Sequence, residues 1–570
     1  MINKPFLIAI ALLYVAFGYS QTKNTEEYFK LVRPLLTGDL AYETVDLVED
    51  YWRVAGNSGF NKTVFRIAES LEEAGYTLEE NASETDRLTY RIEKREMKNP
   101  TWEPVSASVS ILGENIPLLQ QSTNRNMVYL NSVSTPENGI SAEVRYIKNP
   151  KELNSSSVTD KIVFFEGSAE PIYEEAILKQ KALGIITYDN PAYLQPEKNS
   201  TAIQFRRLPY QEKSKAWGIA LSYDAKEKLK TALQKGKVEL NVNIHTKIYA
   251  SEELTVVADV KGAKFPEERL VFSAHIQEPG ANDNASGVGA QLEMAVLTAK
   301  LLQAGNIDID RTITYLWGDE IISTHRYIQE NEARAKHIKW GISLDMVGEN
   351  TEITGGSFLI EKMPDPSAVW ARGEDKHTEW GGEVLTLEDM KPHYFNDYIH
   401  QIFKKQGEFA DWKVNVNPFE GGSDHMPFLD ADIPGLLLWH FTDQFYHTDQ
   451  DRIDKVSKET LKNVGTGALV SALTLANADS DTVLDVLENL SKTAQKRLKN
   501  EFDLSKKSIE NGSKPADEKK ILMAWQDWYL SAMEATKDLE QKPSLQLVEK
   551  VISAQNKLKL QTKYQIKQLK

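Results

Sequence analysis

The sequence contains no cysteine among its 570 residues, and this absence removes several classes of site at once. Disulfide bonds, thiolate zinc sites and cysteine nucleophiles are all excluded. Any metal ion must therefore be bound by histidine, aspartate, glutamate or water. Basic residues are also in deficit, because 67 Lys and Arg face 83 Asp and Glu, which gives a net charge of -16. A general nucleic-acid binder needs a basic face, so the sequence predicts no nucleic-acid partner.

Long apolar runs are scarce, and the clearest one stands at the N-terminus. An apolar run from Pro5 to Phe17 is followed by the small residues Gly18 and Ser20. The run is about 13 residues long, which is short for a membrane span of roughly 20 residues. We therefore predict a signal peptide over residues 1–20 and a secreted or periplasmic protein, with an uncleaved anchor as the alternative. No later segment is long and apolar enough to predict a membrane span.

The remaining composition predicts a multidomain α/β protein. Hydrophobic residues make up 41% of the chain, with 11 Trp, 22 Tyr and 19 Phe, which supports substantial cores. At roughly 150 residues per domain, the length predicts about three or four domains. Strand-like and helical runs alternate over residues 141–250, which predicts a small inserted α/β domain. Residues 21–140 and 251–478 are predicted to form the main domain around it, and amphipathic stripes predict a C-terminal helical domain over 479–570.

Ionisable side chains stand at the ends of several strand-like runs in residues 251–478. These side chains are His275, the adjacent acids Asp319 and Glu320, and Asp345. In open α/β sheets, ligands bind outside the carboxyl ends of the strands. A lone buried carboxylate is unfavourable unless a cation or donors compensate it, which favours a ligand role for Asp345. In isolation, the pair Asp319 and Glu320 also fits an acidic surface turn.

Loops add a further acid and a second imidazole. Asp283 lies in the small-residue loop GANDNASG, where the backbone can approach a site closely and the two carboxylate oxygens can bridge two cations. Taken alone, Asp283 fits a helix N-cap equally well. His447 follows Tyr446 in the segment YHTDQD, after a strand-like run. The donors form two three-ligand sets that share Asp283, as two zinc ions demand: His275, Asp283 and Asp345, and Asp283, Glu320 and His447.

These residues resemble the secreted di-zinc aminopeptidases, relatives of bacterial leucyl aminopeptidase, glutamate carboxypeptidase and the transferrin receptor. The likeness covers most of residues 40–475, with the GANDNASG loop, the WGDE turn, the LDMVG strand, GSDH and YHTDQD in the family's order. It implies a mixed, mostly parallel sheet flanked by helices, with a protease-associated domain over 141–250. By resemblance, the metal ligands are His275, Asp283, Glu320, Asp345 and His447, the general base is Asp319, and the oxyanion donor is Tyr446. Asp424 and His425 match a family signature without being ligands.

Two positions depart from the family's usual pattern. The family usually has Glu as the base, whereas Asp319 is one methylene shorter, so we expect reduced activity or a differently placed base. The family also usually places an Asp two residues after its first His, to fix the imidazole, and this chain has Gln277 there. A glutamine carbonyl accepts a hydrogen bond but brings no charge to raise ligand basicity. Weaker affinity at the first metal is therefore expected.

The sequence thus predicts a secreted exopeptidase with two Zn²⁺ ions that acts on peptides or proteins, with an aminopeptidase favoured. A carboxypeptidase or dipeptidase of the same family is one alternative. A non-catalytic binding protein, as the transferrin receptor exemplifies, is another, and loss of metal ligands would mark it. All five ligand positions carry suitable side chains here. The sequence leaves open the preferred chain end, oligomer formation, and whether the C-terminal helices dock on the catalytic domain or contact a second subunit.

Overall fold

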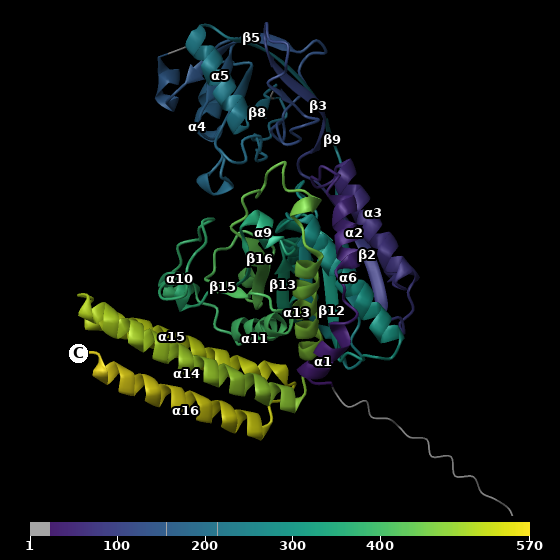
Figure 1. Cartoon of the computed structure of the whole chain (residues 1–570). Coiled ribbons are helices and arrows are strands. Elements are labelled where there is room, and N and C mark those ends of the chain that lie inside the picture. Colours follow the sequence, from purple (N-terminus) through teal and green to yellow (C-terminus); the bar gives the residue numbers. More distant parts are fainter. Residues whose placement is uncertain (1–22, 156, 214) are drawn as a thin grey trace, which may run out of the picture.

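A computed structural model describes residues 23–155, 157–213 and 215–570, so the signal peptide predicted over residues 1–20 lies outside the described residues. A nine-stranded sheet forms the centre of the body, with a second sheet above it and three long helices below it (Figure 1). The large sheet has the order β1-β2-β10-β12-β11-β13-β16-β14-β15. Its strands are β1 (Thr77–Leu78), β2 (Leu88–Glu96), β10 (Glu252–Val260), β11 (Phe265–His275), β12 (Arg311–Gly318), β13 (Ile338–Leu344), β14 (Ser357–Glu361), β15 (Asn415–Asn417) and β16 (Gly435–Phe441).

The central strands β12, β11, β13 and β16 run parallel, and β10 and β14 pair with them antiparallel. Successive residues of β11 enter two different cores. Leu270 and Phe272 belong to the large core, while Val271 joins a smaller one with Tyr327 and Ile328. Side chains alternate across a strand, so both faces of the sheet are covered. The predicted mixed, mostly parallel sheet flanked by helices is confirmed.

Helices of very different lengths cover the sheet. The bounds are α1 (Thr25–Val32), α2 (Asp39–Val48), α3 (Ser58–Glu73), α6 (Ala285–Gln303), α7 (Ile322–Gln329), α8 (Glu332–Ala335), α9 (Thr351–Thr354), α10 (Pro366–Val369), α11 (Phe395–Ala410), α12 (Met426–Asp430) and α13 (Lys458–Ala476). Almost every residue of α6 is buried, which suits a helix covered by other helices. Glu293 of α6 accepts backbone N–H bonds from Thr37, Gly38 and Ala41 at 2.9 to 3.0 Å. These bonds satisfy otherwise orphaned donors at the start of α2 and attach it to α6.

A second, seven-stranded sheet with its own core forms the inserted domain. Its order is β4-β3-β9-β5-β6-β7-β8. Its elements are β3 (Thr101–Ile111), β4 (Leu119–Gln120), β5 (Ile140–Ile147), β6 (Ile162–Phe165), α4 (Glu170–Tyr173), β7 (Gly184–Thr187), β8 (Gly218–Ala220), α5 (Tyr223–Lys235) and β9 (Glu239–Tyr249). The sequence predicts this unit over 141–250, but β3 pairs with β9 from Thr101↔Tyr249 to Ile111↔Leu240. The second sheet therefore includes strands that precede residue 141.

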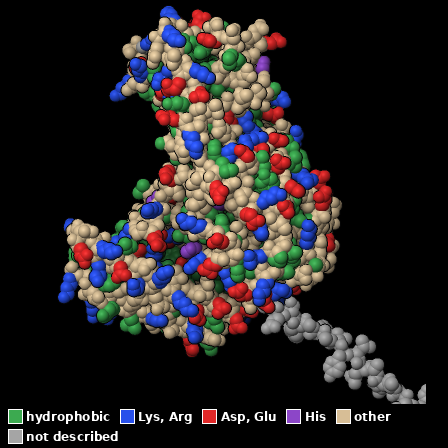
Figure 2. Space-filling view, in the orientation of Figure 1, with side chains coloured by type: hydrophobic (Ala, Val, Ile, Leu, Met, Phe, Trp, Pro, Cys, Tyr) green, Lys and Arg blue, Asp and Glu red, His purple; other side chains and the backbone are tan. Residues whose placement is uncertain are grey.

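The C-terminal residues form three long helices that pack against one another, α14 (Ser480–Glu510), α15 (Pro515–Ala535) and α16 (Leu545–Gln568). Arg372 joins them to the body, because its guanidinium contacts Glu501 of α14 at 2.7 Å and Glu518 of α15 at 2.6 Å. Figure 2 shows acidic and basic side chains interspersed over the visible face, these helices included. Of the helices in the described residues, none combines the length and apolar character needed to cross a membrane. The helices thus dock on the body that carries the large sheet, one of the two roles that the sequence leaves open.

A buried histidine in β16 makes the stability of the fold depend on pH. His440 is fully buried, and its Nδ1 contacts the carbonyl oxygen of Met346 at 2.7 Å. Burial lowers the pKa of His440 from 6.5 to about 4. Between these pH values the unfolded chain binds a proton that the native chain does not, so the free energy of unfolding falls as the pH is lowered from 6.5 to 4. Protonation of His440 should contribute up to about 3 kcal/mol of this loss.

We therefore expect His440→Asn to flatten the dependence, since an amide keeps a donor toward Met346 but does not titrate. Urea unfolding of both proteins at intervals from pH 7 to pH 4 measures the two slopes. Equal slopes for wild type and variant would contradict a neutral buried imidazole.

Candidate metal centre

The ends of three neighbouring parallel strands bring the predicted site residues to one edge of the large sheet. His275 ends β11 and is in register with Gly318 at the end of β12, after which Asp319 and Glu320 follow. Ser273 of β11 pairs with Ser343 of β13, so Asp345, two residues further along, lies level with His275. Parallel strands end on the same side, which explains how residues distant in sequence meet here.

His275 lies at the centre of a first cluster. Its Nε2 lies 3.3 Å from Asp345 Oδ1 and 3.6 Å from Asp283 Oδ1. His275 is only 1% exposed, and neither its Nε2 nor Asp345 Oδ1 has a hydrogen-bond partner among the described residues. Buried polar atoms are normally satisfied, and a cation between the imidazole and the carboxylates would satisfy this set.

His447 lies at the centre of a second cluster, which shares Asp283 with the first. His447 Nε2 lies 2.9 Å from Asp283 Oδ2 and 3.1 Å from Glu278 Oε2. Asp283 therefore turns one oxygen to each histidine, as a carboxylate bridging two cations would. Each set of three donor atoms lies within 4.8 Å of one another, the spacing of a set able to hold one metal ion.

The sequence motifs do not identify Glu278, which lies in the second cluster, where Glu320 is predicted. Glu320 lies on the other side of the site, with Oε1 3.9 Å from Nε2 of His275. Its second oxygen accepts a hydrogen bond from Gln277 Nε2 at 3.1 Å, and its backbone N–H donates to Gln277 Oε1 at 2.8 Å. Gln277 also orients the first histidine, because its backbone oxygen lies 3.1 Å from His275 Nδ1. Gln277 thus positions Glu320 through its side-chain amide and His275 through its backbone oxygen.

A buried acid and a buried arginine fix the backbone of the loop that carries Asp283. The carboxylate of Asp451 accepts backbone N–H bonds from Asn282 and Asp283, both at 2.9 Å. Arg53 is fully buried and donates to the carbonyl oxygens of Ile276 and Gly280, both at 2.8 Å. Such a fixed backbone holds the bridging carboxylate in one orientation.

The electrostatics of the site also favour cations. Burial raises the pKa of Asp283 to about 7, and the nearby charge of Glu278 adds to the effect. Burial likewise raises the pKa of Asp319 to about 7, although Arg207 and His275 oppose it. Carboxylates crowded in a dry site resist ionisation together, and divalent cations relieve their repulsion. The donor set, rich in carboxylate and imidazole and free of thiolate, fits zinc.

The remaining predicted residues surround these clusters. The ring of Tyr446 stacks on that of His447, with centroids 3.7 Å apart. Burial, followed by the charge of Asp283, raises the pKa of Tyr446 well above 10, so its phenol stays protonated as a donor. Asp424 accepts the backbone N–H of Ile321 at 2.6 Å, and His425 Nε2 contacts Glu361 at 3.0 Å. Neither of the last two belongs to either ligand set.

A cavity of about 270 Å³ opens over the two clusters. Its polar wall holds four carboxylates, those of Glu278, Asp283, Glu320 and Asp345, together with His447 and Tyr446. Its apolar wall consists of Met346, Trp380, Leu437 and Trp439. Among the described residues that line it, none is Lys or Arg. The cavity can therefore hold a cationic group beside an apolar side chain.

The inserted domain contacts the rim of this cavity. The ring of Phe205 packs on that of His447 with centroids 4.5 Å apart, and its backbone N–H donates to the carbonyl oxygen of His447 at 3.0 Å. Asp449 accepts the backbone N–H of Ile203 at 2.9 Å and the side-chain amide of Asn124 at 3.1 Å. Residues of the inserted domain thus hold the backbone on both sides of residue 448.

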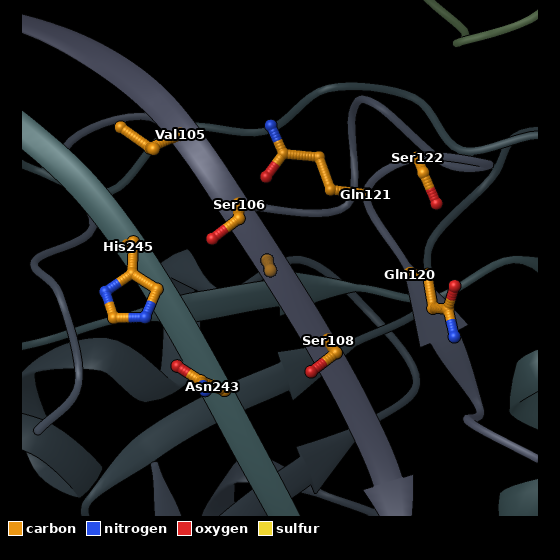
Figure 3. Close-up of a pocket in the computed structure, with 9 residues that line it drawn as sticks. Val105, Ser106, Ser108, Gln120, Gln121, Ser122, Asn243 and His245 are labelled. Atoms are coloured by element: carbon orange, nitrogen blue, oxygen red, sulfur yellow. The ribbon is translucent and has the colours of Figure 1, made fainter. Parts of the chain in front are cut away.

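A larger cavity of about 580 Å³ lies within the inserted domain, over β3 and β9 (Figure 3). The side chains of Ser106, Ser108, Asn243 and His245 line it from these two strands. One histidine and no acid occur among the described residues around it, so it cannot hold a metal ion as the first site can.

Comparison with known proteins finds a matching family and several relatives. Residues 255–472 match the model of Peptidase family M28. The chain is 23% identical over 446 residues to Aminopeptidase YwaD of Bacillus subtilis, which covers 75% of this chain and 82% of that protein. It is 31% identical over 133 residues to an aminopeptidase of Pseudomonas aeruginosa, over 21% of this chain and 24% of that protein.

Two solved structures share the fold. The structure of BSAP, a zinc aminopeptidase from Bacillus subtilis, matches with a TM-score of 0.52 at 19% identity, over 76% of this chain and 94% of that one. A Peptidase M28 precursor from Shewanella amazonensis matches with a TM-score of 0.55 at 19% identity, over 80% of this chain and 98% of that one.

Proposed function

We propose that this chain, which belongs to peptidase family M28 through residues 255–472, is a zinc-dependent aminopeptidase. Relatives named as aminopeptidases and zinc aminopeptidases support both the reaction and the metal. Peptides are the substrate class of such an enzyme. The protease-associated identity predicted for residues 141–250, and secretion or a periplasmic location, stay predictions.

One observation favours the amino end of the substrate over its carboxyl end. The cavity over the clusters is lined by four carboxylates and, among its described residues, by no Lys or Arg. Two zinc ions would offset the charge of these carboxylates, but the lining still offers no Lys or Arg to pair with a C-terminal carboxylate, whereas a carboxylate oxygen that binds no metal can accept a hydrogen bond from an N-terminal ammonium group. The apolar wall of Met346, Trp380, Leu437 and Trp439 supports an uncharged first side chain.

We further propose that the two clusters hold two zinc ions. The proposed ligands are His275, Asp283, Asp345 and His447 of the two clusters, together with one further carboxylate, for which the sequence proposes Glu320. Zinc, when bound, supplies Lewis acidity toward water and toward the scissile carbonyl. Asp319 takes the proton of the attacking water as general base and later delivers one to the leaving amine. Tyr446 donates a hydrogen bond to the oxygen on which negative charge develops.

The test combines metal content with chain-end preference. Purified protein should bind two equivalents of zinc, measured by plasma emission spectroscopy after dialysis, and should hydrolyse amino-acid anilides with a free amine. N-acetylated anilides should be poor substrates, while peptides amidated at the C-terminus should be cleaved normally. Cleavage of N-blocked peptides with release of the C-terminal residue would indicate a carboxypeptidase. Zinc-free protein without hydrolysis would indicate a binding protein.

A further inference from the structure

We propose that Glu278 is the third protein ligand of the second metal ion, beside His447 and Asp283, in the position that the family pattern gives to Glu320. The inference rests on the proposed function, because it assigns a ligand of the same metal centre. The sequence motifs do not point to Glu278. The conformation of the backbone that follows His275 brings the side chain of Glu278 to the site.

The geometry of the second cluster carries the proposal. Glu278 Oε2 lies 3.1 Å from Nε2 of His447, and Asp283 Oδ2 lies 2.9 Å from the same nitrogen. Three ligand atoms, one from each residue, fall within the spacing of a single metal site. The Oε2 atom of Glu278 is buried and lacks a hydrogen-bond partner among the described residues. A bound cation would satisfy this oxygen, which lies next to an imidazole and a second carboxylate.

Glu320 is engaged elsewhere, which leaves the second cluster to Glu278. One oxygen of its carboxylate, Oε2, and its backbone N–H are hydrogen-bonded to the side-chain amide of Gln277, and Oε1 points toward the first cluster. Its nearest imidazole contact is His275 at 3.9 Å, and it forms no ion pair with His447. Gln277 can do this because an amide offers both a donor and an acceptor, whereas the aspartate usual at this position offers acceptors alone.

The backbone conformation at Glu278 directs its side chain toward the second cluster. Glu278 has a φ of +82°, a left-handed conformation that few non-glycine residues adopt. Its N–H donates to the carbonyl oxygen of Arg53 at 3.0 Å, and the guanidinium of Arg53 binds Ile276 and Gly280 on either side. The strained residue is therefore held by a buried arginine, as expected where strain serves a site. The family's acid at position 277 is thus replaced by an acid one residue later, with a new role.

Zinc stoichiometry of two isosteric variants tests the assignment. Glu278→Gln should retain one equivalent of zinc after dialysis against a weak chelator, with the affinity for the second ion lowered by more than about 100-fold, beyond the usual effect of an outer-shell partner. Glu320→Gln should retain both equivalents. The exposed Glu267→Gln is the matched control for loss of one acidic charge, and circular dichroism verifies that each variant is folded.

Other outcomes would overturn the proposal. Two tightly bound zinc ions in Glu278→Gln would show that Glu278 is no ligand. Loss of one ion from Glu320→Gln would return the ligand role to Glu320, whatever Glu278→Gln does. The wild-type protein separates this from the proposed function: if it binds two zinc ions and cleaves anilides, only the ligand assignment is at stake. Wild type without zinc would contradict both.

Discussion

Asp283→Ala is expected to abolish peptidase activity and to remove both metal ions. Asp283 turns Oδ1 toward His275 and Oδ2 toward His447, so the substitution takes one ligand from each cluster. The carboxylate of Asp451 fixes its position by accepting the backbone N–H groups of Asn282 and Asp283. Because the metal centre supplies several kcal/mol of transition-state stabilisation, activity should fall at least about 1,000-fold.

Zinc content and anilide hydrolysis measure this effect side by side. Asp308→Ala is the matched control, since Asp308 is an exposed acid that pairs with Arg87. In the presence of a chelator, Asp283→Ala should be no less stable than wild type, because it removes a buried carboxylate repelled by Glu278. Near-normal zinc binding by Asp283→Ala would exclude a shared bridging ligand.

Asp319→Asn is expected to keep its zinc and lose its turnover. Asp319 follows β12 directly and lies beside the clusters without belonging to either. An amide of equal size preserves packing but cannot accept a proton, so kcat should fall by about 100- to 10,000-fold while KM changes little. Stopped assays of kcat and KM, with zinc content on the same sample, separate loss of the base from loss of metal.

Asp319→Glu provides the informative partner to this variant. Glutamate is the residue usual at this position in the family that the sequence resembles. Asp319→Glu keeps the carboxylate and lengthens the side chain by one methylene, so it should retain substantial activity. Full turnover in Asp319→Asn would remove Asp319 as the base. The same result combined with an inactive Glu320→Gln would assign proton transfer to Glu320, which lines the cavity.

Much of the site could be predicted from sequence because its residues stand at the ends of apolar strands. His275 and Asp345 stand at the ends of apolar strands that are buried on both faces. Because these strands pair in parallel, both residues come to the same edge of the sheet. Asp283 could be predicted because small residues surround it. Glu278 could not, since its place depends on a positive φ and on Arg53, which is more than two hundred residues away in sequence.

The extent of the inserted domain was equally hard to predict. The half-exposed polar residues of β3 resemble a loop, and the strand becomes recognisable only through β9, from which it is separated by most of the inserted domain. Local patterns predict strands that are buried on both faces far better than strands whose partner is distant.

The contact between Phe205 and His447 has a thermodynamic consequence. Since backbone bonds from residues 203 and 205 hold residues 449 and 447, unfolding of the inserted domain releases the segment that carries the second histidine. We therefore expect zinc binding at the sheet edge to stabilise the inserted domain as well, although that domain contributes no ligand. Proteolytic cleavage within the second sheet should therefore lower activity at the metal centre, because the inserted domain also supports the segment that carries His447.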